Sequence, residues 1–170
     1  IKVADDRSLE LTDEGRRRAT EVIRKHRLAE RLLLDVIGLD RRLVHEEACR
    51  WEHVMSEQVE GRLASILDDV STDPFGNPVP PQTAEHPRPS ADEVSAERLA
   101  SRETTTAVVS RIGEPIQADA ELIAALEDAA ITAGAQVELR VSAGGVRLVG
   151  ASGDPVVLSD DVARHLFVRR

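Results

Sequence analysis

Residues 25–57 read KHRLAERLLLDVIGLDRRLVHEEACRWEHVMSE, and their pattern predicts two amphipathic helices joined by a tight turn. Apolar residues recur at helical spacing up to Ile37, and Gly38 is the residue type that most often ends a helix. Asp40 then supplies an N-cap for a second helix, which we expect to run to about Val54. This segment therefore indicates a helical first half of the chain.

Further cap residues extend the helical pattern in both directions. Thr12, followed by Asp13 and Glu14, predicts the start of the first helix, because acidic side chains are favoured near a helix N-terminus. Ser56 predicts the start of a third helix directly after the second. Most of the first 70 residues are therefore expected to be helical.

Short alternating segments precede the first helix. IKVA (1–4) and LELT (9–12) flank the turn-forming residues DDRS (5–8), and this pattern predicts a β-hairpin. The sequence begins at Ile1 rather than at a methionine, in the middle of such a pattern. We therefore expect that an N-terminal part of the protein is missing from it.

The second half of the chain has a different character. Six of the eight prolines lie in residues 73–89, which predicts a loop or an extended linker, and residues 91–103 fit either a helical turn or disorder. A helix is expected at about residues 120–129. Strand patterns occur in TTTAVVSRI (104–112), QVELRVS (136–142), GVRLVG (145–150), PVVLS (155–159) and FVRR (167–170). Short strands with Gly-Gly and Gly-Asp turns predict a small SH3-like barrel.

The overall composition argues against several classes of protein. A net charge of −9 argues against a broad basic surface for nucleic acid, and 2% aromatic residues argue against single-strand binding by base stacking. A single cysteine excludes an internal disulfide framework and suits a reducing compartment. Because no apolar run is long enough to span a membrane, we expect a cytoplasmic protein without a membrane partner.

The quoted segment contains the only cysteine of the chain and three of its histidines. Cys49, Glu52 and His53 stand at positions i, i+3 and i+4, so one helical face presents a thiolate, a carboxylate and an imidazole. These groups form half a coordination shell for a transition metal, and the thiolate excludes Mg²⁺ and Ca²⁺ as natural occupants. Taken singly, Cys49 would more often be a small buried residue and Glu52 a solvated one.

The first helix carries a second candidate pair, His26 and Glu30, at positions i and i+4. If the two helices pack antiparallel across Gly38, His26, Glu30 and His45 meet at a second centre. One such pair alone is usually a solvated ion pair. The convergence of the cysteine and several histidines on helical spacings nevertheless favours metal binding.

Two other functions fit the same residues. The sequence C-x-x-E-H at 49–53 is similar to the inverted zinc motif H-x-x-E-H of metallopeptidases, with cysteine in place of the first histidine. A peptidase requires Glu52 to be free to activate water, and a thiolate ligand is unusual in such sites. A metal-buffering module without a DNA partner is the other alternative. Hydrolysis that Glu52→Gln abolishes would identify the peptidase, and metal binding without any DNA partner would identify the buffer.

Apolar residues on other faces of the two helices suggest a dimer. Trp51 and Met55 stand at i and i+4 on a face that Cys49 does not share, and Leu32 and Val36 belong to an apolar cluster on the first helix. Packing in the core of one chain is the simpler interpretation. Because one chain has little other mass to cover both apolar faces, we favour a homodimer interface.

Residues 25–57, followed by VSTDPFGNPVP (70–80), closely resemble the diphtheria toxin repressor and iron-dependent regulator family of actinobacteria. The resemblance covers Ile1 to about Pro81 and, more loosely, the rest of the chain. It implies an α+β fold in four parts. These are a winged-helix wing remnant (1–12), a helical metal-binding and dimerisation domain (13–70), a Pro-rich linker (71–103) and a small SH3-like (FeoA-type) β-barrel (104–170).

The resemblance also implies two sets of metal ligands. The primary set would be Cys49, Glu52 and His53, which the family completes with an upstream methionine that this chain lacks. The ancillary set would be His26, Glu30, His45, Glu114 and Gln117; read alone, Glu114 and Gln117 are ordinary loop residues.

The family also has an anion pocket beside the ancillary metal. It would match Arg27 and Asn77 here, but Asp73 stands where the family has a serine. Since a carboxylate repels an anion, we do not expect this pocket to work in the same way.

The function implied by this resemblance is Fe²⁺-dependent transcriptional repression by a homodimer, without enzymatic activity. Operator DNA would be bound by the full-length protein through an upstream recognition helix, and not through these 170 residues. A cysteine ligand favours iron over manganese, although Co²⁺, Ni²⁺, Mn²⁺ or Zn²⁺ are expected to bind in vitro.

Overall fold

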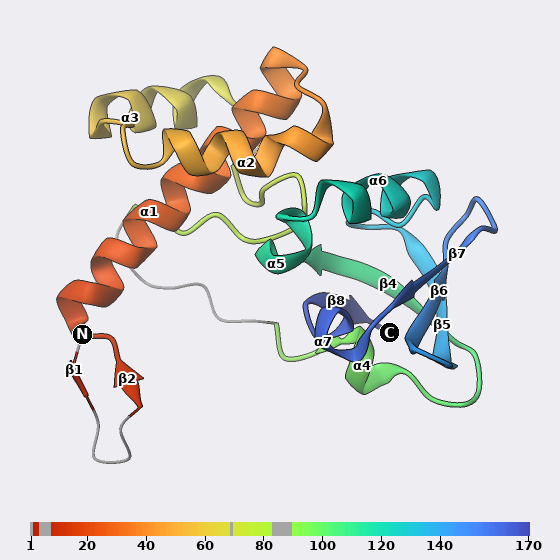
Figure 1. Ribbon diagram of the computed structural model, residues 1–170. Helices are drawn as coiled ribbons and strands as arrows, with labels where there is room; N and C mark the ends of the chain where they lie inside the picture. The colour runs from red at the N-terminus through yellow and green to blue at the C-terminus, as the bar shows by residue number, and fades with distance from the viewer. Residues whose placement is uncertain (1, 4–7, 69, 83–89) are drawn as a thin grey trace.

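Helices form the first half of the molecule. The computed structural model describes residues 2–3, 8–68, 70–82 and 90–170. A hairpin leads into the helices, and Figure 1 shows it beside the start of α1. The elements are β1 (Lys2–Val3), β2 (Leu9–Glu10), α1 (Asp13–Arg31), a π-helix η1 (Leu32–Ile37), α2 (Arg41–Trp51) and α3 (Glu57–Ile66). The predicted hairpin is present, although residues 1 and 4–7 lie outside the described part of the chain.

The predicted cap residues begin and end these helices. Thr12 Oγ1 accepts a hydrogen bond from the Gly15 amide, and Asp40 and Ser56 cap α2 and α3 in the same way. Gly38 has φ +74°, the left-handed conformation that glycine adopts without strain. Two details differ from the prediction. The first helix widens to a π-helix before Gly38, and α2 ends at Trp51 instead of about Val54.

An antiparallel sheet forms the second half of the molecule. Its order is β3-β8-β4-β5-β6-β7, so β3 and β7 are its two edges. The predicted small β-rich domain is present, but its sheet is open and does not form the expected barrel: β3, with only two residues, pairs with β8 alone and does not close the ladder onto β7. The strands are β3 (Val94–Ser95), β4 (Thr105–Ile112), β5 (Gln136–Ser142), β6 (Gly145–Val149), β7 (Pro155–Leu158) and β8 (Leu166–Arg169).

Four helices accompany the sheet: α4 (Ala96–Leu99), α5 (Glu114–Gln117), α6 (Ala120–Asp128) and α7 (Asp160–Ala163). The α6 helix matches its prediction. Within residues 91–103, which the sequence left undecided, Ser95 belongs to β3 and also caps α4. This part of the predicted linker therefore belongs to the sheet.

A buried junction loop, which contains Phe75 and Gly76, joins the helical half to the sheet half next to the predicted ligands. Phe75 is 1% exposed, and its carbonyl accepts a hydrogen bond from the Ile112 amide of β4. A Cβ on Gly76 would lie 2.2 Å from the Ser110 carbonyl, so only glycine fits there. Helices α5 and α6 lie between α2 and the sheet (Figure 1). The junction therefore places α5 beside the metal-ligand helices.

No helix in the described ranges combines the length and the apolar character that crossing a membrane would require.

Candidate metal centre

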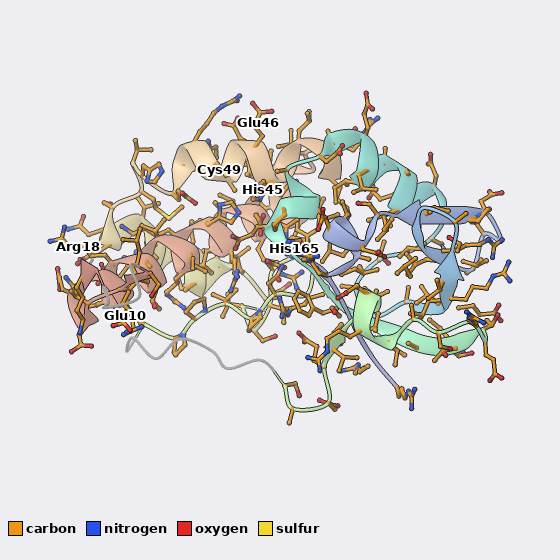
Figure 2. The ribbon with its side chains drawn as sticks, turned by 60° about the horizontal axis from the view of Figure 1, so that its bottom comes forward. Glu10, Arg18, His45, Glu46, Cys49 and His165 are labelled. Atoms are coloured by element: carbon orange, nitrogen blue, oxygen red, sulfur yellow. The ribbon has the colours of Figure 1, made fainter. Side chains whose placement is uncertain are left out.

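Two facing helices bring the candidate ligands together. His26 and Glu30 lie one turn apart on α1, and His45 and Cys49 lie one turn apart on α2. Figure 2 shows His45 and Cys49 on α2, with Glu46 on the outer side of the same helix. His26 and Glu30 are buried, at 4% and 0% exposure. The antiparallel packing that the Gly38 turn predicts therefore creates the convergence.

Three ligand atoms form a tight triangle at the centre of this cluster. His26 Nε2 lies 2.9 Å from Glu30 Oε1 and 3.1 Å from His45 Nδ1, and His45 Nδ1 lies 3.3 Å from the same Glu30 oxygen. The other carboxylate oxygen, Glu30 Oε2, is buried without a hydrogen-bond partner among the described residues. Because a buried carboxylate is stable only beside a positive charge, this geometry fits a cation between the two helices.

The pKa values of His26 and Glu30 indicate how the charge of the buried carboxylate is balanced when no metal is bound. Burial lowers the pKa of His26, but hydrogen bonds and charges of Glu30 and Glu52 outweigh it and raise that pKa above its ordinary value. Burial raises the pKa of Glu30, while His26 and His45 outweigh burial and lower that pKa. The two shifts favour an ion pair of imidazolium and carboxylate in the absence of metal, and a bound metal ion would take the place of the proton.

Cys49 extends the cluster with a sulfur atom. Its Sγ lies 3.7 Å from His45 Nε2, and each of His26, His45 and Cys49 offers a ligand atom within 4.8 Å of the others. Burial raises the pKa of the thiol, and the nearby carboxylates, Glu52 first, raise it further. A neutral thiol must lose its proton to bind a metal, so affinity for a cation depends on pH. Sulfur, nitrogen and oxygen donors together suit a transition metal.

His53 does not lie on the same face as Cys49, contrary to the prediction, whereas Glu52 reaches the same cluster as Cys49. Because α2 ends at Trp51, the i+4 relation between Cys49 and His53 is lost in the turn that follows, and the His53 side chain is 70% exposed. The Glu52 side chain, 14% exposed, instead turns toward α1, and its Oε2 lies 2.7 Å from His26 Nδ1. The two predicted sets are therefore joined into one network through His26.

Glu114 and Gln117 approach from the sheet half, on the short helix α5. Glu114 is half-exposed and accepts a hydrogen bond from Arg27 Nη2 at 3.2 Å. Gln117 is 2% exposed, and its Nε2 donates to the Ile112 carbonyl, whereas its Oε1 is buried without a hydrogen-bond partner in the described part of the chain. A buried carbonyl oxygen without a partner fits a role as a metal ligand. Among the described residues, neither side chain hydrogen-bonds to the His26 triangle, so their ligand role remains a prediction.

The residues of the predicted anion pocket already bind a carboxylate of the protein itself. Asn77 Nδ2 donates to Asp73 Oδ2 at 2.9 Å, and Asp73 Oδ1 accepts from the Phe75 and Asn77 amides. Arg27 Nε lies 3.7 Å from Asp73 Oδ2, beyond hydrogen-bonding distance. The Asp73 carboxyl thus occupies the hydrogen-bond donors of Asn77, in keeping with the expectation that the family's pocket is altered here.

The pH dependence of stability should report the state of Asp73. Burial raises its pKa to about 7, Glu30 adds to the effect, and Asn77 and Arg27 oppose it. The folded chain therefore holds this proton more tightly than the unfolded chain, so the stabilisation is complete below the ordinary aspartate pKa and is lost as pH rises through about 7. Between the ordinary aspartate pKa and a pH of about 7, the free energy of unfolding should fall less in Asp73→Ser than in the wild-type chain, by at least about 1 kcal/mol. Urea unfolding at a series of pH values measures it, and identical slopes in both proteins would contradict the assignment.

The predicted dimer residues lie at and beside an apolar groove. Leu32, Trp51 and Met55 line it, although Met55 is only 8% exposed and packs largely within its own chain. Val36 is 60% exposed outside the groove. Sequence reasoning missed Val54, which lines the groove and is 81% exposed. The signal available in the sequence was that Val54 is an apolar residue close to the end of the helix that carries the ligands. The other lining residues are Ser56, Val59 and Leu63.

Comparison with known proteins adds an independent line of evidence. Residues 12–81 match the model of the iron dependent repressor metal binding and dimerisation domain, and residues 95–170 match that of the diphtheria toxin repressor SH3 domain. The chain is 44% identical over 176 residues to the iron-dependent repressor IdeR of Mycobacterium tuberculosis, covering 100% of this chain and 76% of that protein. It is 47% identical over 174 residues to the diphtheria toxin repressor of Corynebacterium glutamicum, covering 100% and 75%. A manganese-dependent transcriptional repressor solved in complex with manganese superposes with a TM-score of 0.79 at 28% identity, covering 94% of this chain and 74% of that one.

Proposed function

This chain belongs to the family of iron-dependent and diphtheria toxin repressors, and from this premise we propose that it senses metal for an Fe²⁺-dependent transcriptional repressor of iron homeostasis. The observation that carries the proposal is the buried triangle of His26, Glu30 and His45. Its carboxylate keeps one oxygen without a partner among the described residues, and Cys49 lies beside it. Such a site suits a metal cation, which would take the place of the proton on His26.

Two ligand sets are proposed for the metal. The ancillary set uses the triangle, with Glu114 and Gln117 from α5, and the primary set uses Cys49, Glu52 and His53. A bound Fe²⁺ would supply the positive charge that draws these ligands together. Co²⁺, Ni²⁺, Mn²⁺ and Zn²⁺ are expected to bind in vitro, because such donors do not select iron by affinity alone.

Metal sensing follows from where the ligands originate. The triangle comes from the helical half, and α5 belongs to the sheet half. Ligands drawn from both halves bind a metal more tightly when the halves are docked, and by linkage the metal favours that docked arrangement. We propose that this arrangement is the repressing one, and that the protein acts in the cytoplasm, where operators lie. With a net charge of −9, these 170 residues are not expected to bind operator DNA by themselves.

The alternatives receive less support. A peptidase would need Glu52 free to activate water, whereas its carboxylate is engaged by His26. The relatives named above are transcriptional repressors, which are not enzymes.

Titration of the chain with Fe²⁺ under anaerobic conditions, and with Co²⁺ as a spectroscopic substitute, tests the proposal. We expect saturable binding, with a sulfur-to-cobalt charge-transfer band that is absent in Cys49→Ala. The site assignment would be contradicted if Cys49→Ala and Glu30→Gln both still bound metal with unchanged stoichiometry.

The apolar groove is proposed as part of the homodimer interface that the matched dimerisation domain supports. Val54→Asp places a charge on this surface, and we expect it to weaken dimerisation by more than about tenfold, because burying an unpaired charge costs several kcal/mol. Val54 is 81% exposed in the single chain, so its fold should be retained. Sedimentation velocity over a range of concentrations measures the effect. Leu9→Asp, at a residue 71% exposed on the hairpin, is the matched control, and equal dimerisation of both variants would exclude this surface.

A further inference from the structure

The carboxylate of Glu52 contacts histidines of both predicted ligand sets. Its Oε2 lies 2.7 Å from His26 Nδ1, and its Oε1 lies 3.2 Å from His53 Nε2. Glu52 follows the last residue of α2, and its side chain is only 14% exposed, so the carboxylate is held at the interface with α1. A residue of the primary set therefore hydrogen-bonds the central residue of the ancillary set.

The His26 ring is held at both nitrogens. Nδ1 faces Glu52, whereas Nε2 faces Glu30 Oε1 at 2.9 Å and His45 Nδ1 at 3.1 Å. A neutral imidazole carries its proton on one nitrogen and binds a metal through the other. A carboxylate that accepts the Nδ1 proton therefore leaves the Nε2 lone pair directed at the other ancillary ligands.

We propose that Glu52 is a positioning residue for the ancillary set: it accepts the Nδ1–H of His26 and fixes the tautomer and ring orientation in which Nε2 faces the cation. The inference rests on the proposed function and deepens it, because it gives Glu52 a role outside the set to which its sequence position assigns it. The two carboxylate oxygens of Glu52 have different partners, because Oε2 contacts His26 while Oε1 faces His53. Carboxylates that orient a ligand histidine typically change metal affinity by about 10–100-fold.

A different role for the same contact makes the opposite prediction. If Glu52 only stabilised the protonated His26 ring, it would favour the proton over the metal, and its removal would raise the affinity for metal. The sign of the change in affinity therefore separates positioning from simple ion pairing.

The test uses the Cys49→Ala chain, in which the primary set has lost its thiolate, so that remaining Co²⁺ binding reports on the ancillary set. Adding Glu52→Ala should lower the Co²⁺ affinity by about 10–100-fold, measured by competition with a chromophoric chelator. Glu52→Gln should recover part of the affinity, because its amide oxygen still accepts the Nδ1 proton. Glu47→Ala, a glutamate on the same helix that bonds Trp51 and Arg50, is the control and should leave the affinity unchanged. Circular dichroism verifies that each variant is folded.

Imidazole proton–nitrogen spectra of the Zn²⁺-loaded Cys49→Ala chain provide a second readout. We expect a His26 Nδ1–H resonance that exchanges slowly with water and is lost in Glu52→Ala. An unchanged or raised Co²⁺ affinity in Glu52→Ala would overturn the positioning role while leaving metal sensing intact. Absence of metal binding by the wild-type chain would overturn the proposed function together with this inference.

Discussion

Replacing Glu30 by glutamine is expected to weaken Fe²⁺ or Co²⁺ binding at the His26, Glu30 and His45 triangle by more than about 100-fold. Residues that only orient ligands are worth about 10–100-fold, and Glu30 is the proposed charged ligand itself. Its carboxylate is completely buried, and Oε2 has no partner among the described residues, so its charge is available to a cation. The amide has nearly the same shape but no charge, and it is a far weaker ligand. Isothermal titration at one pH measures the difference.

Glu46→Gln is the matched control for this change. Glu46 lies on the outer side of α2 (Figure 2), and its side chain is 69% exposed and paired with Arg50. Its replacement removes the same charge close to the cluster without removing a proposed ligand. Equal affinity of the Glu30→Gln and Glu46→Gln chains would show that the triangle does not hold the metal.

Replacing Phe75 by alanine should lower the free energy of unfolding by about 3–5 kcal/mol, the usual cost of removing a buried aromatic ring. Phe75 is 1% exposed, belongs to the hydrophobic core, and lies with its ring 5.5 Å from the guanidinium of Arg41 on α2. Because its loop joins the two halves, the cavity would form beside α2. Urea unfolding with a chelator present measures the effect, since bound metal would add its own stabilisation.

Leu9→Ala is the control for Phe75→Ala, because Leu9 is 71% exposed and its truncation should change stability by less than about 0.5 kcal/mol. Phe75→Leu should fall between the two. A loss below about 1 kcal/mol in Phe75→Ala would indicate that the loop separates from the core at little cost, and that the two halves are not held together there.

The sequence by itself determined the helical pairing and most of the cluster. The i, i+4 spacings of His26 with Glu30 and of His45 with Cys49 depend only on the helical repeat, and Gly38 turns the chain so that the two pairs face each other. Caps and strand alternation likewise depend on neighbouring residues. These features follow from local chemistry, so the sequence was sufficient to predict them.

Tertiary structure decided the features that depend on distant residues. The end of α2 at Trp51 exposes His53 and turns Glu52 toward His26, and nothing in the local pattern distinguishes that end from one at Val54. Asp73 meets Asn77 only through the folded junction loop. The sheet remains open because closure requires its edge strands, distant in the chain, to meet in register. Helical periodicity is a property of adjacent residues, whereas helix ends, ion-pair partners and sheet closure are set by packing between segments far apart in the chain.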